Sequence, residues 1–275
     1  MESDWARGVD IDTPSAARMY DYYLGGGHNF AADRQAADAV IAAIPDLPRI
    51  AQANRAFLRR AVRFLVASGV RQFVDVGSGI PTVGNVHEIA QQLDPAAATV
   101  YIDLDPIAVT HSRQLLAGDP RATVLRADLR EPDELLARLR EEPAAGVVDL
   151  DQPVAVLLVS VLHFVPGEEA YPHVAALLDA VAPGSWLAVS HSSVEGFAGL
   201  GKDDFDSAEE AYKKTTTPVG LRTRAEIERF FAGLAVADPG LVWVPEWRPD
   251  ETVGPFAGEP WRSGMLAAVG QKPAT

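Results

Sequence analysis

The chain has 275 residues, 48% of them hydrophobic, which is enough for one hydrophobic core with an appendage. Its formal net charge of −14 argues against nucleic acid as a bulk electrostatic partner, and the lack of cysteine excludes disulfides and cysteine-ligated metals. The polar N-terminus is unlike a secretory signal and no apolar run approaches the roughly 20 residues that span a bilayer, so we expect a cytoplasmic protein.

The first part of the chain has the pattern of helices interrupted by glycines. We predict helices over 14–24 and 33–44, with Ser15 as a cap for the first helix and the glycines at 25–27 as the break between them. Residues 1–13 look loosely docked. The tyrosines and phenylalanine of this region either cover a ligand, with the glycines as a hinge, or form the core of a plain helical cap.

An amphipathic helix is predicted over 49–68, and its broad apolar face should pack on the sheet just ahead of the first strand. Asn54, near its start, either reaches the ligand site or caps the helix. The arginines that lie close together in this part of the sequence are Arg55, Arg59, Arg60, Arg63 and Arg71. They form either a solvated helix face, which is the simpler interpretation, or a local basic groove.

From residue 72 onward, apolar strands alternate with amphipathic helices. Strands are predicted over 72–76, 99–103, 122–125, 153–160, 185–191, 241–244 and 265–270. Helices are predicted over 85–93, 107–117, 132–140, 168–182 and 222–234, with a further helix and loop within 196–215. Asn85 and Glu88 have the spacing of a capping box. The repeated order implies an α/β fold with a doubly wound, mostly parallel, seven-stranded sheet.

The stretch FVDVGSGIPT, residues 73–82, is predicted to be a buried strand that ends in a glycine turn. Gly77 and Gly79 can adopt backbone angles that are closed to other residues, and they leave room for a ligand. A helix that starts near residues 82–85 would turn its free N–H groups and its positive dipole end toward the same crevice. Asp75 is an acid at the end of an apolar strand, so it needs local donors or a cationic ligand.

Two further strand ends carry acids. Asp103 ends the strand predicted over 99–103 and lies 28 positions after Asp75. A strand, helix and parallel strand occupy about 30 residues, so these two strand ends should be neighbours, and an acid there can accept both hydroxyl hydrogens of a ribose. Asp128 follows the next short strand. Three strand ends in a row, each with an aspartate, predict a nucleoside pocket.

At these residues the sequence resembles class I S-adenosylmethionine-dependent methyltransferases. More narrowly, it is similar to an actinobacterial family first described as a domain of unknown function and later named S-adenosyl methyltransferase. The segments that carry the resemblance are PSAARMYDYYLGGGHNF (14–30), NRAFLRRAVRFL (54–65), VDVGSGIPT (74–82), NVHEIAQ (85–91) and YIDLDPIAV (101–109). The resemblance covers nearly the whole chain. Pro81 departs from the broader pattern, where a third glycine is common, but proline suits the entry to a helix.

The resemblance implies a Rossmann-like methyltransferase fold with a reversed last strand and S-adenosyl-L-methionine as the cofactor. It also favours the lid interpretation of the N-terminal helices. The implied division is a helical lid over 1–68 and a cofactor-binding methyltransferase domain over 69–275.

Each predicted cofactor contact follows from the chemistry of an adenosyl sulfonium cation. Asp103 would accept from the ribose hydroxyls, with Asp105 as a helix cap, and Asp128 would accept from the adenine amino group. Asp75 would order the glycine turn or reach the amino group of the methionine portion. The residues predicted to contact the cofactor are Arg18, Tyr22, Asp75, Gly77, Ser78, Gly79, Asp103, Leu104, Asp128, Leu129 and Ser160. Asn29 is a further polar candidate in the lid.

Ser160 and His163 follow the fourth strand, which borders both cofactor and substrate in methyltransferases. His163, with an ordinary pKa of about 6.5, is predicted to take a proton from the acceptor or else to be a structural histidine, and His191 and His28 are weaker alternatives. No pair of histidines has the spacing of a metal site, so no metal is expected. Because the cofactor carries an activated methyl group, alignment can replace a dedicated base.

The leading prediction is therefore an enzyme that transfers a methyl group from S-adenosylmethionine to a small-molecule oxygen or nitrogen. A non-catalytic cofactor-binding regulatory protein is an alternative that the sequence does not separate from it. An NAD-dependent oxidoreductase would require a fuller Gly-x-Gly-x-x-Gly and a hydride-transfer set, and neither is apparent. Nucleic acid and membrane partners are not expected, and the acceptor and the oligomeric state are left open.

Overall fold

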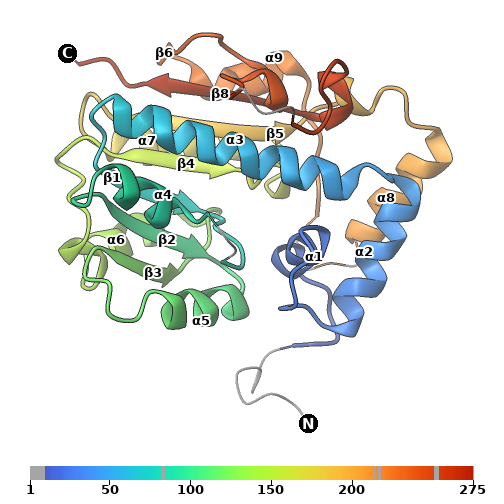
Figure 1. Cartoon of the computed structure of the whole chain (residues 1–275), viewed down its shortest axis with the longest axis horizontal. Coiled ribbons are helices and arrows are strands. Elements are labelled where there is room, and N and C mark those ends of the chain that lie inside the picture. Colours follow the sequence, from blue (N-terminus) through green and yellow to red (C-terminus); the bar gives the residue numbers. More distant parts are fainter. Residues whose placement is uncertain (1–9, 82–83, 214, 216–217, 251–253, 275) are drawn as a thin grey trace.

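A central sheet with helices on both faces forms most of the molecule, and a group of helices lies beyond one end of it (Figure 1). The computed structural model describes residues 10–81, 84–213, 215, 218–250 and 254–274. The predictions for residues 1–9 and for Thr82 lie outside the described residues.

The sheet has the order β3-β2-β1-β4-β5-β8-β6, and β7 pairs with β8. In chain order the strands are β1 (Gln72–Val76), β2 (Ala98–Asp103), β3 (Ala122–Arg126), β4 (Ala155–Val159), β5 (Trp186–Ser192), β6 (Ala235–Val236), β7 (Val242–Trp243) and β8 (Met265–Gln271). The first five strands are parallel, and β8 runs antiparallel to β5, β6 and β7. The doubly wound α/β prediction with a reversed last strand is confirmed. The two-residue strand β6 was missed because it is too short to show an alternating pattern.

The helices connect the strands as predicted, although several are shorter than their sequence patterns. They are α1 (Ala16–Tyr23), α2 (Ala31–Ala43), α3 (Leu47–Ala67), α4 (Val86–Leu93), α5 (Pro106–Leu115), α6 (Pro132–Leu139), α7 (Ala170–Asp179), α8 (Lys202–Lys213) and α9 (Arg224–Glu228). The 3₁₀ turns are η2 (Ala144–Gly146), η3 (Leu162–Phe164), η4 (Glu195–Phe197), η5 (Arg229–Phe231), η6 (Val244–Glu246) and η7 (Pro260–Ser263). The helix predicted over 222–234 is thus divided into α9 and η5.

Alternate residues of each central strand enter two different cores, as the period of two in a strand requires. On one face, Phe73 and Leu157 pack with α3 and α4. On the other face, Val74 and Leu158 pack with α6 and α7. The apolar face of α3 is buried at Phe57 and Leu65, which confirms that this amphipathic helix packs on the sheet.

A third core joins α1, α2 and α8, which we call the cap. Met19 of α1, Val40 of α2 and Ala208 of α8 are buried together in it. Figure 1 shows the cap beyond the carboxyl ends of the parallel strands, where the glycine turn after β1 also lies. The cap therefore unites the N-terminal helices with a helix almost 200 positions later in the sequence.

Candidate functional site

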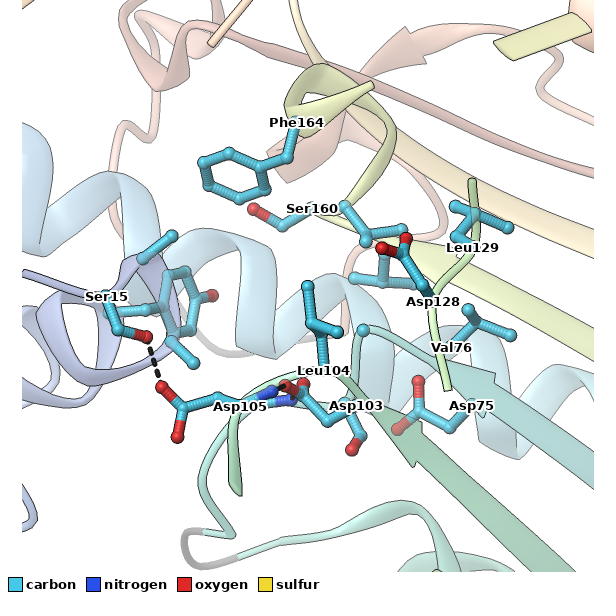
Figure 2. A pocket seen from close by; sticks show the side chains of 18 of the residues that line it. Ser15, Asp75, Val76, Asp103, Leu104, Asp105, Asp128, Leu129, Ser160 and Phe164 are labelled. Carbon is cyan, nitrogen blue, oxygen red and sulfur yellow. Dashed lines mark hydrogen bonds between the residues drawn. The ribbon is translucent and has the colours of Figure 1, made fainter. Parts of the chain in front are cut away.

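The carboxyl ends of β1, β2, β3 and β4 meet α1 and α3 around a cavity of about 570 Å³. Figure 2 shows the aspartates and Ser160 around this space. The predicted cofactor contacts that line it are Arg18, Asp75, Gly77, Ser78, Gly79, Asp103, Leu104, Asp128, Leu129 and Ser160. The structure thus places nearly the whole predicted set, which spans more than 140 positions of sequence, on one cavity.

The glycine turn after β1 adopts the left-handed backbone that the sequence predicted. Gly77 has φ of 71° and Gly79 has φ of 67°. A Cβ added to Gly77 would lie 2.3 Å from Cγ2 of Val161, so both the backbone angle and the space require glycine there. The N–H groups of Gly77 and Ser78 donate to the carbonyl of Ile102, which ties the turn to β2.

Asp103 is buried at the end of β2 and connects the glycine turn to the next helix. Its Oδ2 accepts from the N–H of Gly79 at 2.7 Å, and its Oδ1 accepts from the N–H of Asp105 at 2.8 Å. Burial raises the pKa of Asp103 to about 6, against the lowering effect of these backbone donors. A carboxylate offers about four acceptor positions, so each oxygen keeps one for a ligand.

Asp75 is also buried on the cavity wall, and burial raises its pKa to about 7. The Arg55 guanidinium opposes this shift and the charge of Asp103 adds to it. Arg55 lines the same cavity from α3 and donates to the carbonyl of Gly84 at 3.2 Å. Within the described part of the chain, no hydrogen bond reaches the Asp75 carboxyl group, so it retains its acceptor positions.

Asp128, after β3, is held by its neighbour Arg130. The Arg130 Nη2 donates to Asp128 Oδ2 at 2.6 Å, and the Arg130 backbone N–H donates to Asp128 Oδ1 at 2.9 Å. Burial alone would raise the pKa of Asp128, but the bonds and charge of Arg130 lower it below its ordinary value. Asp128 therefore stays an anion with a fixed orientation beside Leu129.

The N-terminus of α4 does not open onto the cavity, contrary to the prediction. The Glu88 carboxylate accepts from the N–H groups of Gly84 and Asn85, each at 2.9 Å, and the Tyr101 hydroxyl accepts from the N–H of His87. The capping box predicted from Asn85 and Glu88 is present, and it occupies backbone N–H groups that a ligand at this end of the helix would need.

The predicted cap residue Ser15 instead joins α1 to the sheet. Its hydroxyl donates to Asp105, and it makes no cap hydrogen bond to α1. Asp105 caps α5, as the sequence alternative allowed, by accepting from the N–H of Ile107 at 2.7 Å. Arg18 is buried against Asp33 at 2.9 Å, and its Nη1 lies 3.6 Å from Asp105. These contacts fasten the cap to the end of β2.

Two polar residues predicted to reach the cofactor from the cap point elsewhere. Tyr22 donates to Asp38 on α2, and the side-chain amide of Asn29 donates to Asp21 and to the carbonyl of Gly26, so neither lines the cavity. Tyr20, one of the aromatic residues that the sequence offered as a cover for the ligand, lines it instead. Residues two positions apart on a helix face different sides, so the choice between two tyrosines depended on which face met the sheet.

A buried polar chain connects Tyr20 to the end of β4. The Asn54 amide donates to the Tyr20 hydroxyl at 3.0 Å, and the Ser190 hydroxyl donates to Asn54 Oδ1 at 2.6 Å. Ser190 Oγ in turn accepts from the N–H of Ser160 at 2.9 Å. Ser160 has φ of 60°, an unusual angle for a residue with a side chain, and this chain of bonds holds it there.

His163 does not line the cavity, which removes the geometric support for its predicted role as a base. It is buried, with its ring centroid 4.3 Å from that of Phe164 and 5.6 Å from that of His191. Burial, together with the charge of Arg222, holds the pKa of His163 well below its ordinary value. His191 is likewise buried, its Nε2 accepts from the Arg222 guanidinium at 2.7 Å, and it lies off the cavity wall.

Arg222 is a residue that the sequence did not single out. Its buried guanidinium donates to the carbonyls of Leu162, Val165 and Gly167. These carbonyls belong to η3 and the segment that follows it, which place Phe164 and Val165 on the cavity wall. A lone arginine in a polar stretch gives no sequence signal for such a role.

A family model and two solved structures match nearly the full length of the chain. A family model described as S-adenosyl methyltransferase matches residues 2–273. A solved structure from Thermobifida fusca YX, described as that of a candidate methyltransferase, is 38% identical, has a TM-score of 0.88, and covers 99% of this chain and 100% of its own. A DUF574 family protein from Streptomyces avermitilis MA-4680 is 39% identical, has a TM-score of 0.86, and covers 96% of this chain and 99% of its own.

A curated relative is similar over a short segment. Ribosomal RNA small subunit methyltransferase H from Halorhodospira halophila (strain DSM 244 / SL1) is 44% identical over 64 residues, which are 23% of this chain and 19% of that protein. This chain therefore matches about a fifth of that relative's length.

None of the described helices has the length and apolar character that crossing a bilayer requires. No group of three or more His, Cys, Asp or Glu side chains among the described residues is arranged to hold a metal ion.

Proposed function

The chain belongs to the S-adenosyl methyltransferase family, and we propose that its cavity binds S-adenosyl-L-methionine and directs the methyl group to a small-molecule oxygen or nitrogen. The observation that carries this proposal is the meeting of Asp75, Asp103 and Asp128 with the glycine turn on one cavity. Its volume of about 570 Å³ lies within the range of roughly 300–1,000 Å³ that is usual for small-molecule sites.

The residues present suit an adenosyl sulfonium. Asp103 has acceptor positions left for two ribose hydroxyls, and its fixed contacts with Gly79 and Asp105 hold it in place. Asp128, kept anionic by Arg130, suits the amino group of an adenine. The carboxylates also favour a cationic ligand over a neutral or anionic one.

The methionine portion of the cofactor carries both an ammonium and a carboxylate. Asp75 and Arg55 line the cavity beside the glycine turn with opposite charges, and the charge of Arg55 acts on Asp75. We assign the ammonium to Asp75 and the carboxylate to Arg55. This pairing gives the buried Asp75 carboxyl the cationic partner that its position requires.

When bound, S-adenosyl-L-methionine would supply an activated methyl group to a lone pair of the acceptor, with sulfur keeping the electrons of the broken carbon–sulfur bond and the acceptor proton released to solvent. The chain's part is to align the acceptor and exclude competing water, which Phe164, Ser160 and the cap are placed to do. No histidine among the described residues lines the cavity, so a dedicated histidine base has no support.

An RNA acceptor is less well supported than a small molecule. The likeness to a ribosomal RNA methyltransferase is confined to 64 residues. Of the arginines of α3, Arg60 donates to the carbonyls of Val244 and Trp247, and Arg55 faces the cavity and donates to the carbonyl of Gly84. The net charge of −14 also opposes association with a polyanion.

Calorimetric titration of the full chain with S-adenosylmethionine, S-adenosylhomocysteine and NAD tests the proposal. We expect both adenosyl compounds to bind and NAD to bind far more weakly or not at all. Binding of NAD alone would overturn the assignment. A protein that binds the cofactor yet forms no S-adenosylhomocysteine with any acceptor would support the non-catalytic regulatory alternative.

The ribose assignment has its own prediction. Asp103→Ala removes both the proposed ribose acceptor and the partner of the Gly79 N–H, so we expect the affinity for S-adenosylhomocysteine to fall by about 100-fold, or roughly 2.7 kcal/mol. Circular dichroism shows whether the variant is folded. Undiminished binding by a folded Asp103→Ala chain would refute the assignment.

A further inference from the structure

The two ends of the cavity differ in charge. The residues at the carboxyl ends of β1, β2 and β3 include Asp75, Asp103 and Asp128. The acceptor end, as we call the wall that carries Phe164 and Ser160, also includes Tyr20, Asn54 and Leu58, and none of these five residues is charged. Figure 2 shows Phe164 and Ser160 across the space from Asp103 and Asp105.

Most polar atoms of the acceptor end already have protein partners. The Tyr20 hydroxyl donates to the carbonyl of Ala51 at 3.2 Å and accepts from Asn54, whose carbonyl oxygen accepts from Ser190. The Ser160 hydroxyl is different: in the part of the chain that the structure describes, nothing hydrogen-bonds to its Oγ. Ser160 is also held at a strained φ of 60°, which fixes where this hydroxyl points.

Charged groups on the same elements face away from the acceptor end. Arg55 neighbours Asn54 on α3, but it donates to Gly84 and acts on Asp75 at the cofactor end. Arg18 is paired with Asp33. A carboxylate or ammonium brought to the acceptor end would therefore lose its hydration without gaining an ion pair, and an ammonium would in addition lie near the sulfonium.

Resting on the proposed function, we infer that the acceptor end takes an uncharged, planar aromatic molecule that carries a hydroxyl group. The ring packs against Phe164, in an offset or edge-to-face arrangement typical of aromatic pairs, and the hydroxyl bonds to Ser160. The apolar side chain of Leu58 adds to the wall around the ring. Charge selects against acidic and basic acceptors, and Ser160 fixes the orientation of the neutral ones.

Four probes with one ring system test the charge selection by calorimetry on the full chain saturated with S-adenosylhomocysteine. They are 2-naphthol, naphthalene, 2-naphthoate and 2-naphthylmethylammonium. We expect 2-naphthol to bind, with affinity at least about 10-fold above that of either charged probe near neutral pH. Equal or tighter binding of a charged probe would overturn the inference, and so would the failure of 2-naphthol to bind at about 1 mM.

Two variants test the assigned contacts. Ser160→Gly removes the hydroxyl at a backbone angle that glycine tolerates, so it should weaken 2-naphthol by about 5-fold and leave naphthalene unchanged. Phe164→Ala should weaken both probes by about 10-fold. Trp261→Ala is the matched control, because Trp261 is an exposed aromatic residue away from the cavity, and it should change neither.

The affinity for S-adenosylhomocysteine in the absence of a probe distinguishes failure of the acceptor inference from failure of the proposed function. It should remain within about 2-fold of wild type in Ser160→Gly and Phe164→Ala, since these residues are assigned to the acceptor. Loss of this affinity in Phe164→Ala would place Phe164 in the cofactor site and refute the inference. Failure of the wild-type chain to bind S-adenosylhomocysteine would instead refute the proposed function itself.

Discussion

The buried carboxyl group of Asp75, to which we assign the ammonium of the cofactor, lowers the stability of the folded chain when it is charged. Without that ligand, Asp75 is desolvated on the cavity wall, and burial raises its pKa to about 7. A raised pKa means that the folded chain keeps a proton that the unfolded chain has already released. The charge on Asp75 therefore lowers the free energy of unfolding as the pH rises from about 4 to about 7.

Asp75→Asn should reveal this effect in urea unfolding without cofactor. At about pH 5 the folded wild-type chain still holds the proton on Asp75, so only part of the destabilisation is present and the free energies of unfolding of the two chains should differ less than at higher pH. At about pH 8 the variant should be more stable by about 1–3 kcal/mol, because the wild-type carboxylate is then charged. The variant should also bind S-adenosylhomocysteine more weakly, since the proposed ammonium partner is gone.

Asp128→Asn is the control with the opposite sign. Arg130 outweighs burial and lowers the pKa of Asp128, so its charge stabilises the fold above about pH 4. This variant should lose stability near neutral pH, where Asp75→Asn gains it. An effect of Asp75→Asn that is the same at about pH 5 and pH 8 would contradict the argument from burial.

Alanine substitutions of Gly77 and Gly79 should lower the free energy of unfolding by different amounts. Gly77→Ala places a methyl group against Val161 and strains a φ of 71°, so we expect the free energy of unfolding to fall by more than about 2 kcal/mol. Gly79→Ala meets open space and should cost only about 1 kcal/mol of backbone strain. Urea unfolding measures both. Adding Val161→Ala should recover only part of the loss in Gly77→Ala, because the Cβ of residue 161 would still lie 2.7 Å from the new methyl group. Equal losses in the single variants would refute the steric explanation.

The sequence predicted the parts of the site that depend on strand ends, because each apolar run stops at an acid or a glycine turn. Asp75, Asp103 and Asp128 were located in this way, and all line the cavity. Tyr20 was named only as one of several aromatic residues that could cover the ligand, because a helix's sequence does not say which of its partly polar faces meets the sheet. The strained φ of Ser160 is a product of tertiary bonds from Ser190, and local sequence carries no trace of it.

At the scale of elements, η3 depends on a residue that is distant in sequence. Arg222 donates to three carbonyls of the segment 162–167, which carries Phe164. Without these donors the buried carbonyls lose their partners, and each such loss costs about 1–3 kcal/mol. Arg222, just before α9, thus sets the position of Phe164 at the acceptor end.

Arg222→Leu should lower the free energy of unfolding by about 3 kcal/mol or more and speed amide exchange across 162–167. Arg222→Lys should recover only part of the loss, since one ammonium cannot replace a planar fork of donors. Arg229→Leu is the control: its ion pair with Glu168 lies near the same segment but is exposed, so its loss should change stability by less than about 1 kcal/mol. A similar effect of Arg222→Leu and Arg229→Leu would contradict the role given to Arg222.

The elements themselves were largely predictable, and their partners were not. The strand and helix alternation from β1 to β5 follows from hydrophobic period and helix caps, which are local. The pairing of α8 with α2 is tertiary, and among the α8 residues whose burial the structure describes, the buried ones are Ala208 and Ala211. The N-terminus of α4 was found correctly, but its capping by Glu88 closed the ligand site expected there.

In the whole molecule, the boundary between the cap and the methyltransferase domain depends on which of them α3 belongs to. The sequence placed the boundary at residue 68, and we now propose a boundary just before α3. The large apolar residues of α3, among them Phe57 and Leu65, pack in the core of the sheet. In the cap core, α3 contributes Ala51 and the partly buried Leu47, and α8 contributes Ala208, Ala211 and the partly buried Tyr212. Loss of α1 and α2 therefore uncovers these few residues, whereas loss of α3 uncovers one face of the sheet.

Two fragments test this boundary. A fragment of residues 69–275 lacks α3, whose buried side chains each contribute about 1.5–3 kcal/mol, and their sum reaches the whole net stability of about 5–15 kcal/mol that is usual for a domain. It should show no cooperative urea transition. A fragment of residues 46–275 keeps α3 and should unfold cooperatively, but it should bind S-adenosylhomocysteine at least about 10-fold more weakly, since Ser15, Arg18 and Tyr20 no longer line the cavity. Cooperative folding of the shorter fragment, followed by circular dichroism, would restore the boundary at residue 68. Full cofactor affinity in the longer fragment would show that the cap serves the acceptor alone.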